Sequence, residues 1–238
     1  MDGLIGIGAI LAMLLVAGGA LGLADRKGFS WRWLLAAAAL VLLNDALLSR
    51  GYGTLPRLIH GAHWNWQGKV LALAATLIIA ALPAIGWRRC GITLRQAAGS
   101  LRPCLIVAGV YGLVFLGLAI AQPNEPWSSE TAAFQLTLPG LEEEPFYRGL
   151  LLLALDRAFA GRVKWLGVEW GWGALLSCAL FGLAHAFSYE HGAFSFDAFT
   201  MAVTGGPSLI AVWIRYRSGS VAIPVLMHNF GNSISLFV

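Results

Sequence analysis

Long apolar runs separated by short polar stretches are the most regular feature of the 238-residue sequence. A helix needs roughly 17 to 25 mostly apolar residues to cross the hydrocarbon core of a membrane. Eight segments meet or approach that length, the fifth and seventh with interruptions: residues 4–24, 31–48, 70–87, 103–121, 141–160, 170–187, 196–214 and 221–238. The pattern predicts an all-α, polytopic membrane protein built as a bundle of about eight transmembrane helices.

The seventh segment contains Gly205-Gly206-Pro207 near its middle. Proline has no backbone N–H to donate and glycine adds backbone freedom, so a helix is weakened where they meet. Irregular backbone within a membrane is tolerated only against protein or a wet cavity. We therefore expect this helix to be kinked or broken at that point.

The composition agrees with a membrane protein, because 58% of the residues are hydrophobic and 12% are charged. Soluble domains carry about a quarter charged residues. The formal net charge is +4, but the Lys and Arg residues are scattered singly or in pairs between apolar runs, which gives no surface for nucleic acid. The three cysteines are far apart in the sequence, so neither a disulfide nor a cysteine-based metal site is expected.

Most of the 16 Lys and Arg residues lie in alternate connections, after the first, third, fifth and seventh apolar segments. Cytoplasmic loops carry such an excess of basic residues. The bias predicts an integral protein of a bacterial inner membrane with both termini outside. The fifth segment then runs from outside to inside, which places its charged start, and with it the active groups, in the outer half of the bilayer.

The fifth segment begins with a charged stretch, Leu-Glu-Glu-Glu-Pro-Phe-Tyr-Arg-Gly at residues 141–149. A charged side chain at the centre of a membrane helix costs about 2.5–3.5 kcal/mol on insertion scales, so charges are rarely kept there without a function. Glu144 and Arg148 are four residues apart and can pair, whereas Glu143 points roughly 100° away and remains available. We interpret the pair as a structural brace and Glu143 as the reactive group. Pro145 is tolerated in a first helical turn, which predicts a helix start near Glu143.

Two later apolar segments carry further polar side chains. The sixth ends with Phe181-Gly-Leu-Ala-His185, and the eighth contains His228-Asn-Phe-Gly-Asn232. A lone histidine in an apolar helix is usually a packing residue, and asparagine often links membrane helices by hydrogen bonds. Here, however, a spare carboxylate, two imidazoles and an amide fall at overlapping depths on three helices. Their coincidence predicts one buried polar site formed by Glu143, His185, His228 and Asn232.

The other three histidines are not assigned to this site. His60 and His63 are three residues apart in the long connection after the second segment and could share a metal ion, but no acidic or cysteine partner is nearby. We interpret them as surface residues and assign no role to His191.

Three short motifs occur in order at the ends of apolar segments: Glu143-Glu144-x-x-x-Arg148, Phe181-x-x-x-His185 and His228-x-x-x-Asn232. Together they resemble the motifs of the CAAX protease and bacteriocin-processing family, also called the Abi family. The resemblance covers roughly residues 136–238, whereas the first four segments match by hydropathy only. We accordingly divide a single membrane domain into a four-span region, residues 1–130, and a four-span catalytic region, residues 131–238.

The resemblance implies an intramembrane endopeptidase of eight helices. In the family, the first glutamate of the first motif and the histidine of the second activate water, which corresponds here to Glu143 and His185. The oxyanion would be held, and the site organised, by two further pairs, His228 with Asn232 and Glu144 with Arg148. Pro145 departs from the usual family pattern.

Two mechanisms and three classes of function stay open from the sequence. We favour hydrolysis without a cofactor, because no His-Glu-x-x-His helix is present, and keep as the alternative a zinc ion held by Glu143, His185 and His228. A peptidase would act on a membrane-anchored or exported protein or peptide in contact with the lipid bilayer. A non-catalytic immunity or peptide-binding protein would use the same bundle without hydrolysis. A transporter is disfavoured, because no internal repeat is visible.

Overall fold

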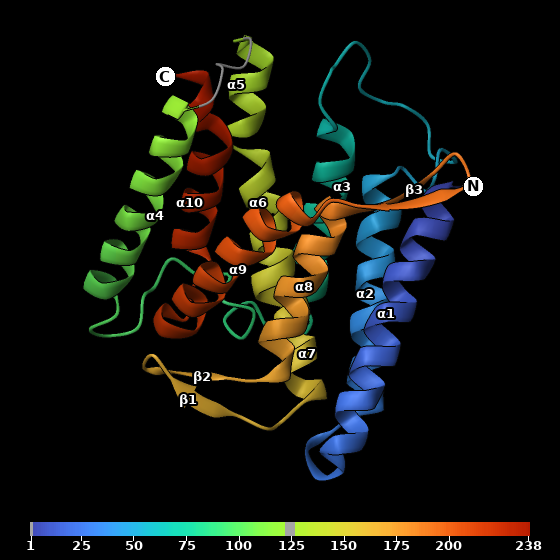
Figure 1. Cartoon of the computed structure of the whole chain (residues 1–238), viewed down its shortest axis with the longest axis vertical. Helices are drawn as coiled ribbons and strands as arrows, with labels where there is room; N and C mark the ends of the chain where they lie inside the picture. The colour runs from blue at the N-terminus through green and yellow to red at the C-terminus, as the bar shows by residue number, and fades with distance from the viewer. Residues whose placement is uncertain (1, 122–126) are drawn as a thin grey trace.

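The computed structural model describes residues 2–121 and 127–238, and over this range the chain is mostly helical (Figure 1). The helices are α1 (Asp2–Ala24), α2 (Trp31–Leu48), α3 (Trp66–Ala81), α4 (Leu101–Ala121), α5 (Ser129–Gln135), α6 (Leu138–Glu144), α7 (Leu152–Ala158), α8 (Trp172–Ala186), α9 (Ala198–Ser218) and α10 (Ala222–Ser233). A π-helical stretch, η2 (Pro145–Leu151), joins α6 to α7, and two short 3₁₀ turns are η1 (Arg26–Gly28) and η3 (Ile234–Leu236). Each of the eight apolar segments overlaps a helix, so the mostly helical prediction is confirmed.

Three helices, α1, α2 and α4, are long and apolar enough to cross a membrane, and α3 and α8 are shorter apolar helices. The apolar surface is plainest on α4, whose buried residues are Cys104 and Ala119. Apart from Arg102 in its first turn, its exposed large side chains are apolar: Leu101, Leu105, Ile106, Val110, Leu113, Val114, Leu118 and Ile120. An exposed apolar surface of this extent is suited to lipid. The chain is an integral membrane protein.

Apolar packing gathers the helices into two groups. The largest buried cluster includes Leu14 of α1, Leu34 of α2 and Leu155 of α7. A second cluster includes Ile214 of α9 and Met227 of α10. Helix α6 lies between the groups, where it packs against α3 and α10 (Figure 1). The three glutamates of α6 are therefore carried into the middle of the bundle.

The charged stretch lies inside one continuous helical rod rather than at its start. Helix α6 begins at Leu138, with Pro139 in its first turn, the helical position that proline favours. The predicted helix start near Glu143 is therefore wrong. Pro145 opens the π-helical stretch η2, a local widening of the helix that tolerates a residue unable to donate the usual backbone hydrogen bond.

Helix α9 runs without a break through Gly205, Gly206 and Pro207, so the predicted break is wrong. Helix α9 passes close to α8 here, because a Cβ built on Gly182 of α8 would lie 3.3 Å from the Cα atom of Gly205, whereas a Cβ built on Gly205 would meet no atom closer than 3.5 Å. Small residues let two membrane helices approach each other closely. The close contact of α8 with α9 therefore depends on Gly182.

Two β-hairpins connect helices, and neither is expected from the apolar pattern. β1 (Val163–Trp165) pairs with β2 (Val168–Trp170) between α7 and α8, and β3 (Phe187–Glu190) pairs with β4 (Ala193–Phe196) between α8 and α9. The second hairpin turns at His191 and Gly192, whose φ angles of 53° and 84° suit a two-residue type I′ turn. Its tip lies beside the start of α1 (Figure 1), where the backbone N–H of His191 donates to Asp2.

Helix α6 is held against α10 by a side chain that hydrogen-bonds to its backbone. Oδ1 of Asn229 accepts from the backbone N–H of Gly140 at 2.7 Å, and Nδ2 donates to the carbonyl oxygen of Thr137 at 3.1 Å. A Cβ at position 140 would lie 2.6 Å from Oδ1 of Asn229 and 2.7 Å from the carbonyl oxygen of Val225. The spacing of α6 and α10 therefore requires glycine at this position.

Replacing Gly140 with alanine should loosen this contact. The added methyl group pushes α6 and α10 apart, and overpacking of this kind costs about 1–3 kcal/mol. The matched control is Gly109→Ala on α4, where an added Cβ meets no atom within 4 Å and alanine has the higher helix propensity. In thermal unfolding in detergent, we expect a lower midpoint for Gly140→Ala and an unchanged or higher one for Gly109→Ala. Equal midpoints would contradict the steric role of Gly140.

Candidate active site

Glu143, His185 and His228 converge on one point from α6, α8 and α10. Oε2 of Glu143 lies 3.8 Å from Nε2 of His185 and 3.6 Å from Nε2 of His228. Glu143 is buried, the side chain of His228 is 11% exposed, and that of His185 is 36% exposed. The three groups are close enough to contact one water molecule together.

The other ring nitrogen of each histidine is already engaged. Nδ1 of His185 lies 2.8 Å from the carbonyl oxygen of Phe181, one turn earlier in α8. A carbonyl oxygen can only accept, so this nitrogen carries the proton. Nδ1 of His228 lies 2.8 Å from Oε1 of Glu144. Both rings are thereby oriented with Nε2 toward Glu143.

Glu144 and Arg148 form the ion pair that their spacing predicts. Nε of Arg148 lies 3.2 Å from Oε2 of Glu144, and both side chains are almost fully buried. The guanidinium carbon of Arg148 also lies 4.0 Å from the centre of the Phe181 ring, a cation–π contact. Because Glu144 also contacts His228 and Phe181 also contacts His185, this pair is linked to both imidazoles.

Glu143 is not the unpaired carboxylate that the sequence suggests, because Lys69 of α3 reaches it. Nζ of Lys69 donates to Oε2 of Glu142 at 2.7 Å and to Oε1 of Glu143. Glu142 has no exposed surface, and the side chain of Lys69 is 12% exposed. The interpretation of Glu143 as an unpaired carboxylate is therefore wrong, because Lys69 pairs with its Oε1. Its second oxygen, Oε2, still faces the two imidazoles.

The apolar pattern does not assign Lys69 to the site, because this residue lies at the start of an apolar segment that carries none of the three motifs. The sequence does contain a signal for it. Three adjacent carboxylates with one arginine leave two negative charges, and buried charges need partners. Asn65 caps α3 by accepting a hydrogen bond from the backbone N–H of Gly68. The helix therefore starts just before Lys69, whose side chain points inward to Glu142 and Glu143.

The start of α3 is in turn fastened to α5 by one carboxylate. Oε1 of Glu130 accepts from the backbone N–H groups of His63 and Trp64 and from Nε1 of Trp66. These bonds, that of the Trp64 amide foremost, hold the pKa of Glu130 below its usual range. The ring of Trp64 also stacks on Phe134 at 5.0 Å. The long connection before α3 is therefore anchored close to Lys69.

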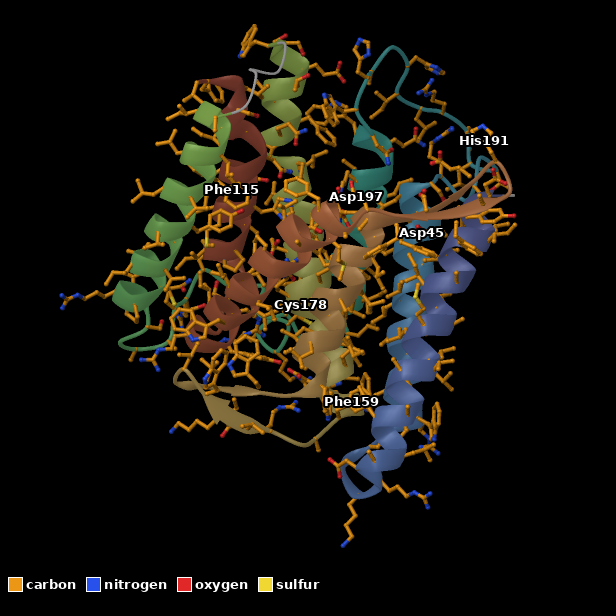
Figure 2. The ribbon with its side chains drawn as sticks, in the orientation of Figure 1. Asp45, Phe115, Phe159, Cys178, His191 and Asp197 are labelled. Carbon is orange, nitrogen blue, oxygen red and sulfur yellow. The ribbon has the colours of Figure 1, made fainter. Side chains whose placement is uncertain are left out.

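A cavity of about 190 Å³ opens beside the convergent groups. Its polar wall includes Glu144, Arg148, His185, His228 and Asn232. Its apolar wall includes Phe115 of α4, which Figure 2 labels on that helix. Asn232 thus lines the cavity, but it is exposed rather than buried as predicted. The buried asparagine nearby is Asn229, which holds α6 to α10.

The zinc alternative fits the residue types but not their partners. Glu143, His185 and His228 are suitable ligands, and histidine ligands usually have their second nitrogen fixed in this way. However, the ammonium of Lys69 occupies the Glu143 carboxylate, so a divalent cation there would face a like charge at close range. Within residues 2–121 and 127–238, no group of three or more His, Cys, Asp or Glu side chains is arranged to hold a metal. The contact between Lys69 and Glu143 therefore disfavours zinc at this position.

The remaining histidines lie outside this cluster. His191 is at the tip of the β3–β4 hairpin (Figure 2). His63 contributes its backbone N–H to Glu130, and His60 lies in the same exposed connection.

Comparison with known proteins supports the motif resemblance. The model of the family described as type II CAAX prenyl endopeptidase Rce1-like matches residues 125–234, so the resemblance is confirmed over that region. An uncharacterized 24.3 kDa protein of Escherichia coli is 29% identical over 170 residues, which cover 66% of this chain and 69% of the relative. No solved structure matches the chain. Lys69 lies outside the matched region.

Replacing Lys69 with methionine removes the ammonium and keeps most of the apolar stem. Glu142 and Glu143 would then be buried without this cation, and breaking a buried ion pair costs about 3–5 kcal/mol. We expect a clearly lower midpoint of thermal unfolding in detergent, with partial recovery in the double variant Lys69→Met/Glu142→Gln. The control Lys164→Met, on the exposed strand β1, should leave the midpoint unchanged. A Lys69→Met protein as stable as the parent would overturn this assignment.

Proposed function

We propose, from the premise that residues 125–234 belong to the Rce1-like family of type II CAAX prenyl endopeptidases, that this protein is an intramembrane endopeptidase. It hydrolyses a peptide bond in or next to a membrane-embedded segment of its substrate, through a water activated by Glu143. The observation that carries the proposal is the approach of one carboxylate oxygen to two imidazole nitrogens at 3.6 and 3.8 Å. These separations are too long for direct hydrogen bonds and suit one bridging water.

Hydrolysis requires a base for the attacking water and an acid for the leaving amine. Oε2 of Glu143 takes a proton from the water as its oxygen bonds to the substrate carbonyl carbon. Nε2 of His185 is unprotonated in the neutral ring, because Nδ1 donates to Phe181. It can therefore relay that proton to the amine nitrogen as the C–N bond breaks. The products are a free carboxyl group and a free amine.

The negative charge that develops on the carbonyl oxygen needs donors. His228 and Asn232 line the cavity next to Glu143, and as an imidazolium His228 donates from Nε2 while Nδ1 remains on Glu144. A donor that is already in place in a site poor in water contributes on the order of 3 kcal/mol to the transition state. Glu144 and Arg148 act by keeping this ring oriented.

The bias of basic residues supports an orientation in which eight helical spans cross a bacterial inner membrane and the site opens in the outer half. Both termini lie toward the same end of the molecule in Figure 1, as an even number of spans requires. The β1–β2 hairpin, with its basic residues Arg162 and Lys164, lies toward the opposite end. The substrate would accordingly be a membrane-anchored or exported protein or peptide.

The central test is Glu143→Gln. Glutamine keeps the shape and can still accept from Lys69 but cannot take a proton, so we expect hydrolysis of a membrane-anchored fluorogenic peptide to fall by about 10²–10⁴-fold. Glu169→Gln, on exposed strand β2, is the control and should keep full activity. Full activity of Glu143→Gln would exclude the glutamate mechanism. A cellular phenotype retained by a well-inserted but inactive variant would favour the non-catalytic peptide-binding function.

The two asparagines of the third motif should separate catalysis from folding. Asn232→Ala removes a proposed oxyanion donor, so we expect kcat to fall by about 10²-fold or more with an unchanged unfolding midpoint. Asn229→Ala leaves the buried N–H of Gly140 without its acceptor and should lower the midpoint by the equivalent of about 1–3 kcal/mol. The reverse pattern would show that the roles are exchanged.

Chelation tests the metal alternative directly. We expect peptide cleavage by the purified protein to be the same with and without a strong zinc chelator, and metal analysis to find no stoichiometric zinc. Activity that is lost with chelator and restored by added zinc would establish the zinc-dependent mechanism instead.

A further inference from the structure

The β3–β4 hairpin is attached directly to the candidate active site. β3 begins two residues after His185, and the base of the hairpin is closed by a hydrogen bond of 2.8 Å from the backbone N–H of Asp197 to the carbonyl of Ala186. Helix α9, which follows, supplies Val203 to the wall of the cavity. Figure 2 shows the hairpin lying across the bundle from its base at Asp197 to its tip at His191.

The two faces of the hairpin differ in polarity. On one face the ring of Phe194 lies 5.4 Å from that of Phe187 and 4.7 Å from that of Tyr189. On the other face the hydroxyl groups of Ser188 and Ser195 lie 2.8 Å apart. Aromatic residues favour the boundary between hydrocarbon and water. The hairpin is therefore suited to lie flat in that boundary, next to the site.

The two edges of the hairpin also differ. The β3 edge packs against α1, where a Cβ built on Gly6 would lie 3.7 Å from the backbone nitrogen of Tyr189. The β4 edge has no partner strand within residues 2–121 and 127–238. Phe194 and Phe196 on β4 are 55% and 56% exposed. β4 therefore presents an open strand edge.

The register shows which backbone groups this edge offers. In a hairpin with a two-residue turn, the residues that flank the turn, here Glu190 and Ala193, form a hydrogen-bonded pair, and such pairs alternate with non-bonded ones. The bond between Asp197 and Ala186 fits the same alternation. The N–H and C=O groups of Phe194 and Phe196 therefore point away from β3.

A peptide bond must leave its helix before it can be hydrolysed. An unwound segment at membrane depth carries N–H and C=O groups that water does not reach, and each unsatisfied group costs several kcal/mol. A free strand edge beside the catalytic groups provides partners for those backbone groups. Exposed edges of this kind are otherwise liable to aggregate, so a protein rarely keeps one without covering it.

We infer that the β4 edge binds the substrate as an added β-strand and delivers its extended backbone to Glu143 and His185. The ligand class is an unwound peptide segment at the membrane boundary, recognised mainly by its main chain. Alternate side chains of the segment would share the aromatic face with Phe194. The inference rests on the proposed function for the cleavage step, but binding itself does not require hydrolysis.

The first experiment measures binding without catalysis. The Glu143→Gln protein, in lipid nanodiscs, is mixed with a palmitoylated peptide of about ten alternating valine and serine residues, a usual strand length. Amide hydrogen exchange is then followed at Phe194 and Phe196. We expect their exchange to slow by about tenfold or more when the peptide is bound, with no comparable change at Lys164 in β1.

Backbone substitutions identify the hydrogen bonds. Two peptides are compared, one N-methylated at the even-numbered amides and the other at the odd-numbered amides. One of them should no longer protect the β4 amides and the other should still protect them, because successive N–H groups of a strand point to opposite sides. In the protein, Phe194→Pro removes an outward N–H, which an edge strand tolerates. We expect it to bind about fivefold more weakly than Phe194→Ala, which loses the same ring but keeps the N–H.

The outcomes separate the two proposals. Protection of the β4 edge without any cleavage by the parent protein would support the edge and overturn the peptidase. Cleavage by the parent protein, with no slowing of amide exchange at β4 and with equal binding of both N-methylated peptides, would overturn the strand-addition proposal. It would leave the peptidase proposal intact. Protection from exchange that rises with protein concentration in the absence of peptide would show that the β4 edge pairs with a second copy of this chain. Binding that is lost equally in Phe194→Ala and Phe194→Pro would show that the aromatic ring, in contact with lipid, and not the strand edge is responsible.

Discussion

The structure depends on pairing three adjacent carboxylates with cations in the middle of an apolar bundle. Each of them would be prohibitively costly alone, since an uncompensated charge in such surroundings costs several kcal/mol. Arg148 compensates Glu144 from the same helix, and Lys69 compensates Glu142 and Glu143 from α3. The second of these pairings joins the two halves of the chain. The polar cluster is therefore both the proposed catalytic centre and a constraint on how α3 and α6 pack.

The two histidines are also held in place by specific partners. Each imidazole uses Nδ1 to fix its orientation, on Phe181 or on Glu144, and keeps Nε2 for Glu143. Neither ring can rotate freely, because its anchor belongs to a buried helix or a buried ion pair. Catalytic groups held in this way lose little freedom when a substrate binds, which is the advantage of a preorganised site. In the proposed mechanism, the Glu144–Arg148 pair orients His228 without contacting the reacting atoms.

Two kinds of packing bring these helices to the required distance. Gly140 lets α10 approach the backbone of α6, and the amide of Asn229 fixes that approach by satisfying the backbone of α6 directly. Gly182 likewise lets α8 approach α9. The β3–β4 hairpin then continues from α8 at the edge of the site. The proposed catalytic centre and an open strand edge therefore follow one another in the chain within a few residues of His185.

The sequence by itself determined the membrane character, the helical segments and the residue types of the site, because each of these follows from local pattern. Apolar length marks the helices, four-residue spacing pairs Glu144 with Arg148, and the three ordered motifs indicate the family. Only the tertiary structure decided that Lys69 pairs with both Glu142 and Glu143, that Asn229 rather than Asn232 joins α6 to α10, and that α9 passes through Gly205 and Pro207 unbroken. Each of these depends on a partner from a distant part of the chain. Hydropathy and spacing describe one segment at a time, so they cannot show which charge, amide or glycine that partner will supply.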